Sequence, residues 1–148
     1  MNASSPGAPF SPAQRTLGLA AAVLMAIGLV TGLYAGLAMS GKIPADGHAA
    51  LASHLNALMG TFLLVSVGWT LPMLRYGAVG QGRLARVFIV ASYANWLITA
   101  VKAALFVSGL DLVGKAANDG VFVALQAFVV LPTLAASIAW ALGFRSKS

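Results

Sequence analysis

Thr16–Ser40 has the sequence TLGLAAAVLMAIGLVTGLYAGLAMS and carries no charged side chain. A helix needs roughly 20 apolar residues to cross a hydrocarbon core of about 30 Å. Three further apolar runs of similar length follow, at about residues 49–74, 84–110 and 120–144. Because backbone polar groups in lipid must be satisfied within the segment, runs of this length are expected to be helical. The sequence therefore predicts an all-α integral membrane protein with four spans.

The overall composition excludes several other classes of protein. The chain has 148 residues, of which 59% are hydrophobic and only 8% are charged. Soluble domains carry roughly a quarter charged residues, so a soluble globular enzyme is excluded. The nine Lys and Arg residues are scattered singly and mostly flank the apolar runs, so the formal net charge of +6 does not indicate nucleic-acid binding. The absence of cysteine excludes disulfides, thiolate metal sites and iron–sulfur clusters.

Short connections at 41–48, 75–83 and 111–119 separate the four runs. Short connections make successive helices antiparallel neighbours, which predicts an up-down four-helix bundle. We expect residues 15–148 to form this single domain. Residues 1–14 are polar and rich in proline, so we expect a flexible N-terminal tail.

Basic residues are distributed unequally between the two sides of the predicted bundle. The side of the two termini carries six of them: Arg15, Arg75, Arg83, Arg86, Arg145 and Lys147. The opposite side carries Lys42 and Lys115. Cytoplasmic loops carry an excess of Lys and Arg, so both termini are predicted to be cytoplasmic. The expected location is the inner (cytoplasmic) membrane, with the lipid bilayer as surroundings.

The third run carries a polar face. Ser92, Asn95, Thr99 and Lys102 are spaced so that they share one side of a helix, with Tyr93 beside them. An amide near the middle of the membrane is costly, so Asn95 either lines an internal site or forms a hydrogen bond between helices. Lys102 is the only formal charge well inside a predicted span. It either extends outward to the interface or pairs with an anionic group such as a cofactor carboxylate.

The second run carries His54 and Asn56 below its outer end. His54 is either an interfacial histidine with an ordinary hydrogen bond or a ligand to a metal or haem iron. His48 lies six residues earlier, about 240° around a helix, so the two histidines do not share a face. His54 would then be the only protein ligand of its chain. The other iron face would stay open, which suits chemistry on a substrate better than electron transfer.

Glycine and proline suggest how two of the helices pack. Gly28, Gly32 and Gly36 form a GxxxGxxxG stripe in the first run, which lets another backbone approach closely. The stripe either packs within the subunit or forms a homo-oligomer interface. Pro132 is expected to kink the fourth helix near mid-membrane.

Two segments resemble a known family. Ser53–Leu64 (SHLNALMGTFLL) and Tyr93–Leu97 (YANWL) are similar to the hydroxylaminobenzene mutases and their relatives, the styrene oxide isomerases. The resemblance extends over roughly residues 52–144 and implies a small four-helix membrane isomerase. In the styrene oxide branch, a haem b lies between the subunits of a homotrimer, held by one histidine of the second helix. The matching positions here are His54 for that ligand and Asn95 for an active-site asparagine.

The chain departs from the styrene oxide branch at three matched positions. It has Ala91 in place of an aspartate, Thr99 in place of a tyrosine, and Gly60 in place of an asparagine. Asn56, one turn earlier on the same helix, is a candidate to replace that missing asparagine. Tyr93 and Thr99 are more similar to the mutase branch. The leading interpretation is therefore a mutase of the hydroxylaminobenzene to 2-aminophenol type. The alternative is a haem-dependent aryl-epoxide isomerase that converts styrene oxide to phenylacetaldehyde.

Both reactions break a bond from oxygen to carbon or nitrogen next to an aromatic ring and must exclude water. We therefore expect a dry cavity with an aromatic lining, with five candidates: Tyr93, Trp96, Phe106, Phe122 and Phe128. The predicted site comprises four catalytic and two cofactor-binding residues: Asn95, Tyr93, Thr99 and Asn56, and His54 and Lys102. More distant alternatives are a b-type cytochrome subunit and a small transporter. The sequence has no evident second axial ligand, as a cytochrome would need, and no intramembrane carboxylate pair, as a cation transporter would need.

Overall fold

The computed structural model describes residues 10–145, and this part of the chain is helical without strands. Its helices are α1 (Pro12–Met39), α2 (Gly47–Thr70) with a 3₁₀ turn η1 (Leu71–Met73), α3 (Ala78–Leu105), α4 (Ala116–Leu125), a π-helical segment η2 (Gln126–Val130) and α5 (Leu131–Gly143). α4, η2 and α5 form one continuous fourth segment. In the described range, four helical segments are long and apolar enough to cross a membrane. The prediction of an all-helical, multi-pass chain is confirmed.

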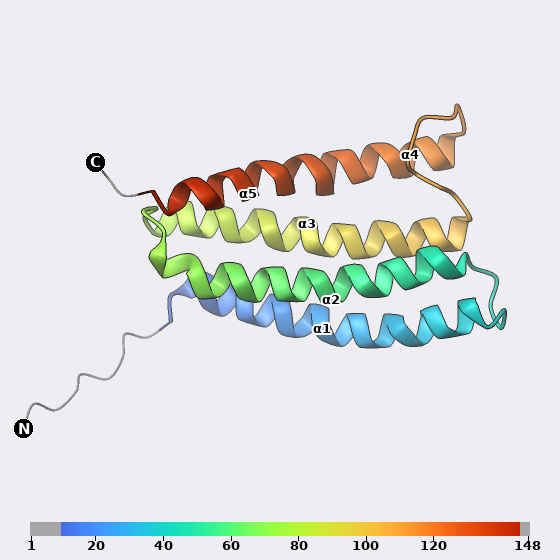
Figure 1. Ribbon diagram of the computed structural model, residues 1–148, viewed down its shortest axis with the longest axis horizontal. Helices are drawn as coiled ribbons and strands as arrows, with labels where there is room; N and C mark the ends of the chain where they lie inside the picture. The colour runs from blue at the N-terminus through green and yellow to red at the C-terminus, as the bar shows by residue number, and fades with distance from the viewer. Residues whose placement is uncertain (1–9, 146–148) are drawn as a thin grey trace, which may run out of the picture.

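Successive helical segments lie side by side and run in opposite directions, so α1 begins and α5 ends at the same end of the molecule (Figure 1). α2 packs against both α1 and α3, and the fourth segment packs chiefly on α3. The most apolar stretch of the fourth segment is only 11% buried, against 28–39% for the other three. The fourth helix is therefore the one that leaves most of its surface to its surroundings.

Large side chains fill the core at the end where α1 begins, and small ones fill it at the opposite end. Phe88 of α3 is fully buried, and Trp140 of α5 packs edge-on against it with ring centroids 5.9 Å apart. The Trp140 indole also donates a 2.9 Å hydrogen bond to Thr70 Oγ1, which attaches α5 to the end of α2. At the opposite end, Ala50 and Ala103 are fully buried in a cluster built largely of alanines. Small side chains let α1, α2 and α3 approach closely there.

The first helix begins inside the segment expected to be a tail. Residues 1–9 of the predicted tail 1–14, and Lys147 of the C-terminus, lie outside the described residues. Pro12–Gln14, however, already belong to α1. Ser11 Oγ accepts from the Gln14 backbone N–H, and the Gln14 side chain accepts from the Ser11 N–H. This capping box, with proline in the first turn, starts the helix earlier than hydropathy suggests.

The third helix ends at Leu105, whereas its predicted span extended to residue 110. Phe106 adopts a left-handed conformation with φ of +53°, and the Asn118 side chain accepts a 2.7 Å hydrogen bond from the Gly109 N–H. The left-handed Phe106 ends the helix, and the Gly109 bond attaches the following connection to the start of α4. Lys102 consequently lies in the last turn of α3, which corrects its expected place well inside a span.

The fourth segment accommodates its proline through the π-helical segment η2. The N–H of Leu131 donates to the carbonyl of Gln126, five residues earlier, directly before Pro132. A π-helical turn absorbs the irregularity that proline imposes on the hydrogen-bond ladder. The segment also places Val129 and Val130 beside α3, at the candidate site described next.

Candidate functional site

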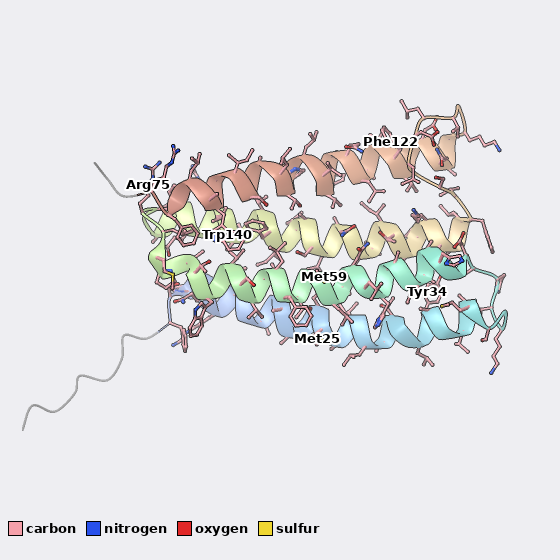
Figure 2. All side chains as sticks on the ribbon, viewed as in Figure 1. Met25, Tyr34, Met59, Arg75, Phe122 and Trp140 are labelled. Atoms are coloured by element: carbon pink, nitrogen blue, oxygen red, sulfur yellow. The ribbon has the colours of Figure 1, made fainter. Side chains whose placement is uncertain are left out.

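A groove of about 580 Å³ lies between α2, α3 and the fourth segment, here called the α2–α5 groove. Its lining consists of Asn56, Met59, Gly60, Leu63, Ala91, Ser92, Asn95, Val129, Val130, Thr133, Leu134 and Ser137. Met59 and Leu134 are 66% and 58% exposed, so the groove opens on the outer surface of the chain. Met59 lies near the middle of α2, far from both ends of the helix (Figure 2). The groove is therefore accessible from the interior of a membrane.

The polar centre of the groove is a hydrogen-bonded set of three side chains. Asn56 Nδ2 donates to Asn95 Oδ1 at 3.2 Å and to Thr99 Oγ1 at 3.0 Å. Thr99 is 5% exposed and lies behind the lining, whereas both asparagines reach the groove. A carboxamide nitrogen carries two hydrogens, so Asn56 uses both of them here. The structure thus brings three of the four predicted catalytic residues together.

This network leaves one donor available to a ligand. Asn95 accepts through Oδ1, and within residues 10–145 its Nδ2 has no hydrogen-bond partner. The Nδ2 atom is also not completely buried, so a bound molecule can reach it. Because Asn95 lines the groove, its free N–H groups can donate to an oxygen atom of a bound molecule. Asn95 thus forms the expected hydrogen bond between helices and also lines a groove, which opens on the outer surface and is not internal.

Tyr93, the fourth predicted catalytic residue, faces away from the groove. Its hydroxyl donates a 2.9 Å hydrogen bond to the carbonyl of Ala20 on α1. Trp96 likewise donates to Thr31 Oγ1 of α1, also at 2.9 Å. The polar tips of these rings find partners on α1, as they must in an apolar environment. The α2–α5 groove therefore has no aromatic side chain in its lining, which consists of aliphatic, hydroxyl and amide side chains. Three further candidates also lie outside it: Phe106, Phe122 and Phe128.

His54 lies on the opposite side of α2, against α1. Its Nδ1 is 2.7 Å from the carbonyl oxygen of Gly28. A carbonyl can only accept, so Nδ1 carries a hydrogen, and in the neutral imidazole the lone pair is on Nε2. Within the described part of the chain Nε2 has no hydrogen-bond partner. Histidines that bind metals commonly donate their other N–H to a carbonyl in this way, so His54 fits a haem-iron ligand.

The glycine stripe makes room for this imidazole. A Cβ atom on Gly32 would lie 3.0 Å from His54 Cε1, and one on Gly28 would lie 3.0 Å from Ala57 Cβ. Gly36 has no atom within 4 Å of such a position. Two of the three glycines thus serve packing within the chain, while the third is free of contacts in the described chain.

The predicted iron ligand and the predicted catalytic amides do not meet within one chain. His54 and Asn56 are two residues apart, about 200° around the helix, so one faces α1 and the other faces α3. His54 is not part of the groove lining. In addition, residues 10–145 contain no group of three or more His, Cys, Asp or Glu side chains placed to hold a metal.

Lys102 lies outside the lining of the groove, although it shares the helix face of Asn95 and Thr99. Its place in the last turn of α3 is favourable for a cation, because the helix dipole is negative there. The long side chain can also carry the ammonium group to the membrane surface.

The structure adds polar groups that the sequence analysis did not select. Thr133 and Ser137 of the fourth segment line the groove opposite Asn95. Their spacing of four residues places them on one helix face, and this signal was available in the sequence. Tyr34 has a buried hydroxyl with no partner in the described chain, and no pattern in the sequence indicates this.

Comparison with family models shows that the model described as styrene oxide isomerase matches residues 13–145. This match covers nearly the whole chain, including His54 and the entire α2–α5 groove. The chain belongs to the styrene oxide isomerase family. The comparisons with curated proteins and with solved structures give no match. Membership in this family confirms the resemblance seen in the sequence and makes the chain a membrane isomerase by family.

Proposed function

We propose that this member of the styrene oxide isomerase family rearranges a small aromatic substrate in the α2–α5 groove without net oxidation or reduction. The observation that carries the proposal is the network of Asn56, Asn95 and Thr99, which leaves free amide donors at the wall of an apolar groove. Ligand sites of this kind combine an apolar lining with a few placed polar groups. The access of the α2–α5 groove from the membrane suits an apolar substrate.

In this proposal Asn95 binds the oxygen atom of the substrate. As the bond from that oxygen to carbon or nitrogen breaks, negative charge develops on the oxygen, and the Nδ2 hydrogens of Asn95 stabilise it. Asn56, held by the buried Thr99, fixes the orientation of the Asn95 amide through its 3.2 Å hydrogen bond. A donor that is already oriented costs no reorganisation during the reaction.

The remaining lining protects the cation that forms on the substrate. The groove is lined by aliphatic, hydroxyl and amide side chains and contains no ionisable side chain in its lining. This lining therefore contains no carboxylate that could attack the cation and no charged side chain that could bind water. Exclusion of water prevents capture of the cation before the rearrangement is complete.

We propose His54 as the residue that would hold a haem b, through Nε2, with Lys102 available to a carboxylate of that group. A ferric haem, when bound, supplies a Lewis acid that polarises the substrate oxygen. Because His54 and the groove occupy opposite sides of α2, the complete site requires residues of neighbouring subunits. A homotrimer, as the family resemblance implies, is the proposed assembly.

The first proposed reaction is the conversion of hydroxylaminobenzene to 2-aminophenol. Ala91 lines the groove where the styrene oxide branch has an aspartate, and Thr99 replaces a tyrosine, so the site lacks both of those groups. The second candidate is isomerisation of styrene oxide to phenylacetaldehyde. The description of the matching family model favours it.

The proposed orientation places both termini in the cytoplasm and the chain in the inner membrane. α1 begins and α5 ends at the same end of the molecule, which is also the end of the α2–α3 connection (Figure 1). The arginines that flank the predicted spans gather at this end. An excess of basic residues marks the cytoplasmic side.

The test uses the full chain, purified in detergent after expression with ample haem. Phenylhydroxylamine is supplied in water enriched in ¹⁸O, styrene oxide is supplied separately with two deuterium atoms on its CH2 group, and products are identified by mass spectrometry. We expect one of two results: 2-aminophenol without ¹⁸O, or phenylacetaldehyde that keeps both deuterium atoms. The Asn95→Ala variant should lose this activity, whereas the control Ser66→Ala, on an exposed face of α2, should retain it. Conversion of neither substrate would contradict the proposal.

A further inference from the structure

A second groove lies between α3 and α5, close to the end where the two termini lie. Two adjoining cavities of about 440 Å³ and about 220 Å³ share Val87 and Pro132 and form one surface, here called the α3–α5 groove. Its apolar lining is completed by Tyr76, Gly80, Leu84, Val90, Phe128, Ala135, Ala136 and Ala139. It shares no residue with the α2–α5 groove, so it is a separate feature of the molecule.

Two arginines border this groove. Arg83 lines the larger cavity and Arg86 the smaller one, and both side chains are exposed. They are three residues apart on α3 and therefore lie on the same side of the helix. Both follow the start of α3 at Ala78 by one to two turns, about 8 to 12 Å along the axis.

These arginines have no acidic side chain nearby. The chain contains only three acidic residues, Asp46, Asp111 and Asp119. All three lie in or beside the α1–α2 and α3–α4 connections, at the opposite end of the helices (Figure 1). No acidic side chain lies at this end of the molecule, so the exposed Arg83 and Arg86 are available to an anionic molecule bound from outside.

We propose that the α3–α5 groove binds one anionic phospholipid. The side chains of Arg83 and Arg86 tilt toward the start of α3, so their guanidinium groups reach toward the level of Gly80, where their paired N–H donors bind the phosphate oxygens. One acyl chain follows the apolar lining from the level of Gly80 to that of Val90, a length of about 15 Å along α3. The order of these groups, charge at the membrane surface and apolar lining below it, matches the order within a lipid.

A second copy of the chain fits this groove less well. Any copy inserted in the same orientation brings the same end of its helices to this level. That end carries arginines and none of the three acidic side chains, so the approach would place like charges together. The charge of the groove therefore favours a lipid headgroup over a second copy.

The test measures lipid binding to the delipidated full chain in detergent by native mass spectrometry. The probes are dioleoyl phosphatidylglycerol and, as the neutral comparison, dioleoyl phosphatidylcholine. We expect a preference for phosphatidylglycerol. The double variant Arg83→Gln/Arg86→Gln should lower affinity for phosphatidylglycerol roughly 25-fold, which is about fivefold for each charge. It should leave phosphatidylcholine binding unchanged. The control Arg15→Gln, an exposed arginine of α1 outside this groove, should retain the preference.

Filling the groove provides a test independent of charge. Ala135 is exposed within the groove, so Ala135→Phe occupies the acyl-chain path without disturbing the core. We expect this variant to lose bound phosphatidylglycerol while its oligomeric state stays the same. The proposal is overturned if the wild-type chain does not distinguish the two lipids, or if Arg15→Gln weakens binding as much as the double variant. It is also overturned if Ala135→Phe changes the oligomeric state and not the lipid binding.

Discussion

The Nδ1 atom of His54 on α2 lies 2.7 Å from the main-chain carbonyl oxygen of Gly28 on α1. The partner is a backbone atom, so the tautomer of His54 depends on how closely α1 and α2 approach. That approach is possible because Gly28 and Gly32 have no side chains where α2 packs. The free Nε2 of His54 is therefore a consequence of helix packing, and it can be tested through the glycines.

Gly32→Ala should weaken haem binding without unfolding the protein. The added Cβ would lie 3.0 Å from His54 Cε1, so the imidazole must shift and its hydrogen bond to Gly28 is disturbed. Loss of such outer hydrogen bonds commonly costs 10- to 100-fold in metal affinity, and we expect about tenfold here. Titration with hemin, followed through the Soret band, measures the effect.

Gly36→Ala is the matched control for this substitution. It lies in the same stripe of α1, but its added Cβ meets no atom within 4 Å. We expect wild-type haem affinity and equal or slightly higher thermal stability, because alanine favours helix over glycine by about 1 kcal/mol. Equal haem affinity in the two variants would mean that the position of the His54 ring does not matter.

His54→Ala should abolish the Soret band of the purified protein and most of its activity. His48→Ala serves as the control, because His48 lies in the first turn of α2 and does not share the face of His54. Absorption spectra of the oxidised and dithionite-reduced proteins make the comparison. A Soret band that persists in His54→Ala would remove this residue from the site and leave the reaction to the groove residues alone.

Asn95→Ala should keep the Soret band and the fold but lower kcat by about 10²- to 10³-fold. This range is typical when one donor to a developing oxyanion is removed. Thr99→Val should act more weakly, by roughly tenfold, since it removes only one of the two hydrogen bonds that orient Asn56. Steady-state kinetics with the accepted substrate measures both. Unchanged rates would reduce Asn95 to a residue that joins α2 and α3.

Much of the fold was predictable, because span number depends on local apolar length. The polar face of the third helix was also predictable from spacing, and it did place Asn95 and Thr99 together. The end of that helix was not, because it lies at Phe106, a residue of ordinary sequence that adopts a left-handed conformation. Because the predicted span ended too late in the sequence, it placed Lys102 too deep in the membrane.

The surroundings of individual side chains could not be predicted, because they depend on which helices meet. Tyr93 was expected beside the face of Asn95, and no pattern in the sequence indicated that α1 would supply a carbonyl to its hydroxyl. His54 and Asn56 were expected together below the outer end of the second helix, although a spacing of two residues puts them on different sides of it. That one side meets α1 and the other the groove follows only from the packing order.

Gly143→Ala should destabilise the attachment of the fourth segment. Gly143 accepts a 2.9 Å hydrogen bond from the Arg75 N–H in the α2–α3 connection. A Cβ on Gly143 would lie 2.9 Å from Tyr76 Cε2 and 3.0 Å from Leu74 Cδ2, so the connection must move away. Overpacking of this kind costs about 1–3 kcal/mol, and the sparse burial of the fourth segment offers little to compensate. Thermal unfolding in detergent should therefore show a lower midpoint.

Gly120→Ala in α4, with no atom within 4 Å of its added Cβ, should leave the midpoint unchanged or raise it. Equal midpoints in the two variants would show that contact with the α2–α3 connection does not hold α5 in place.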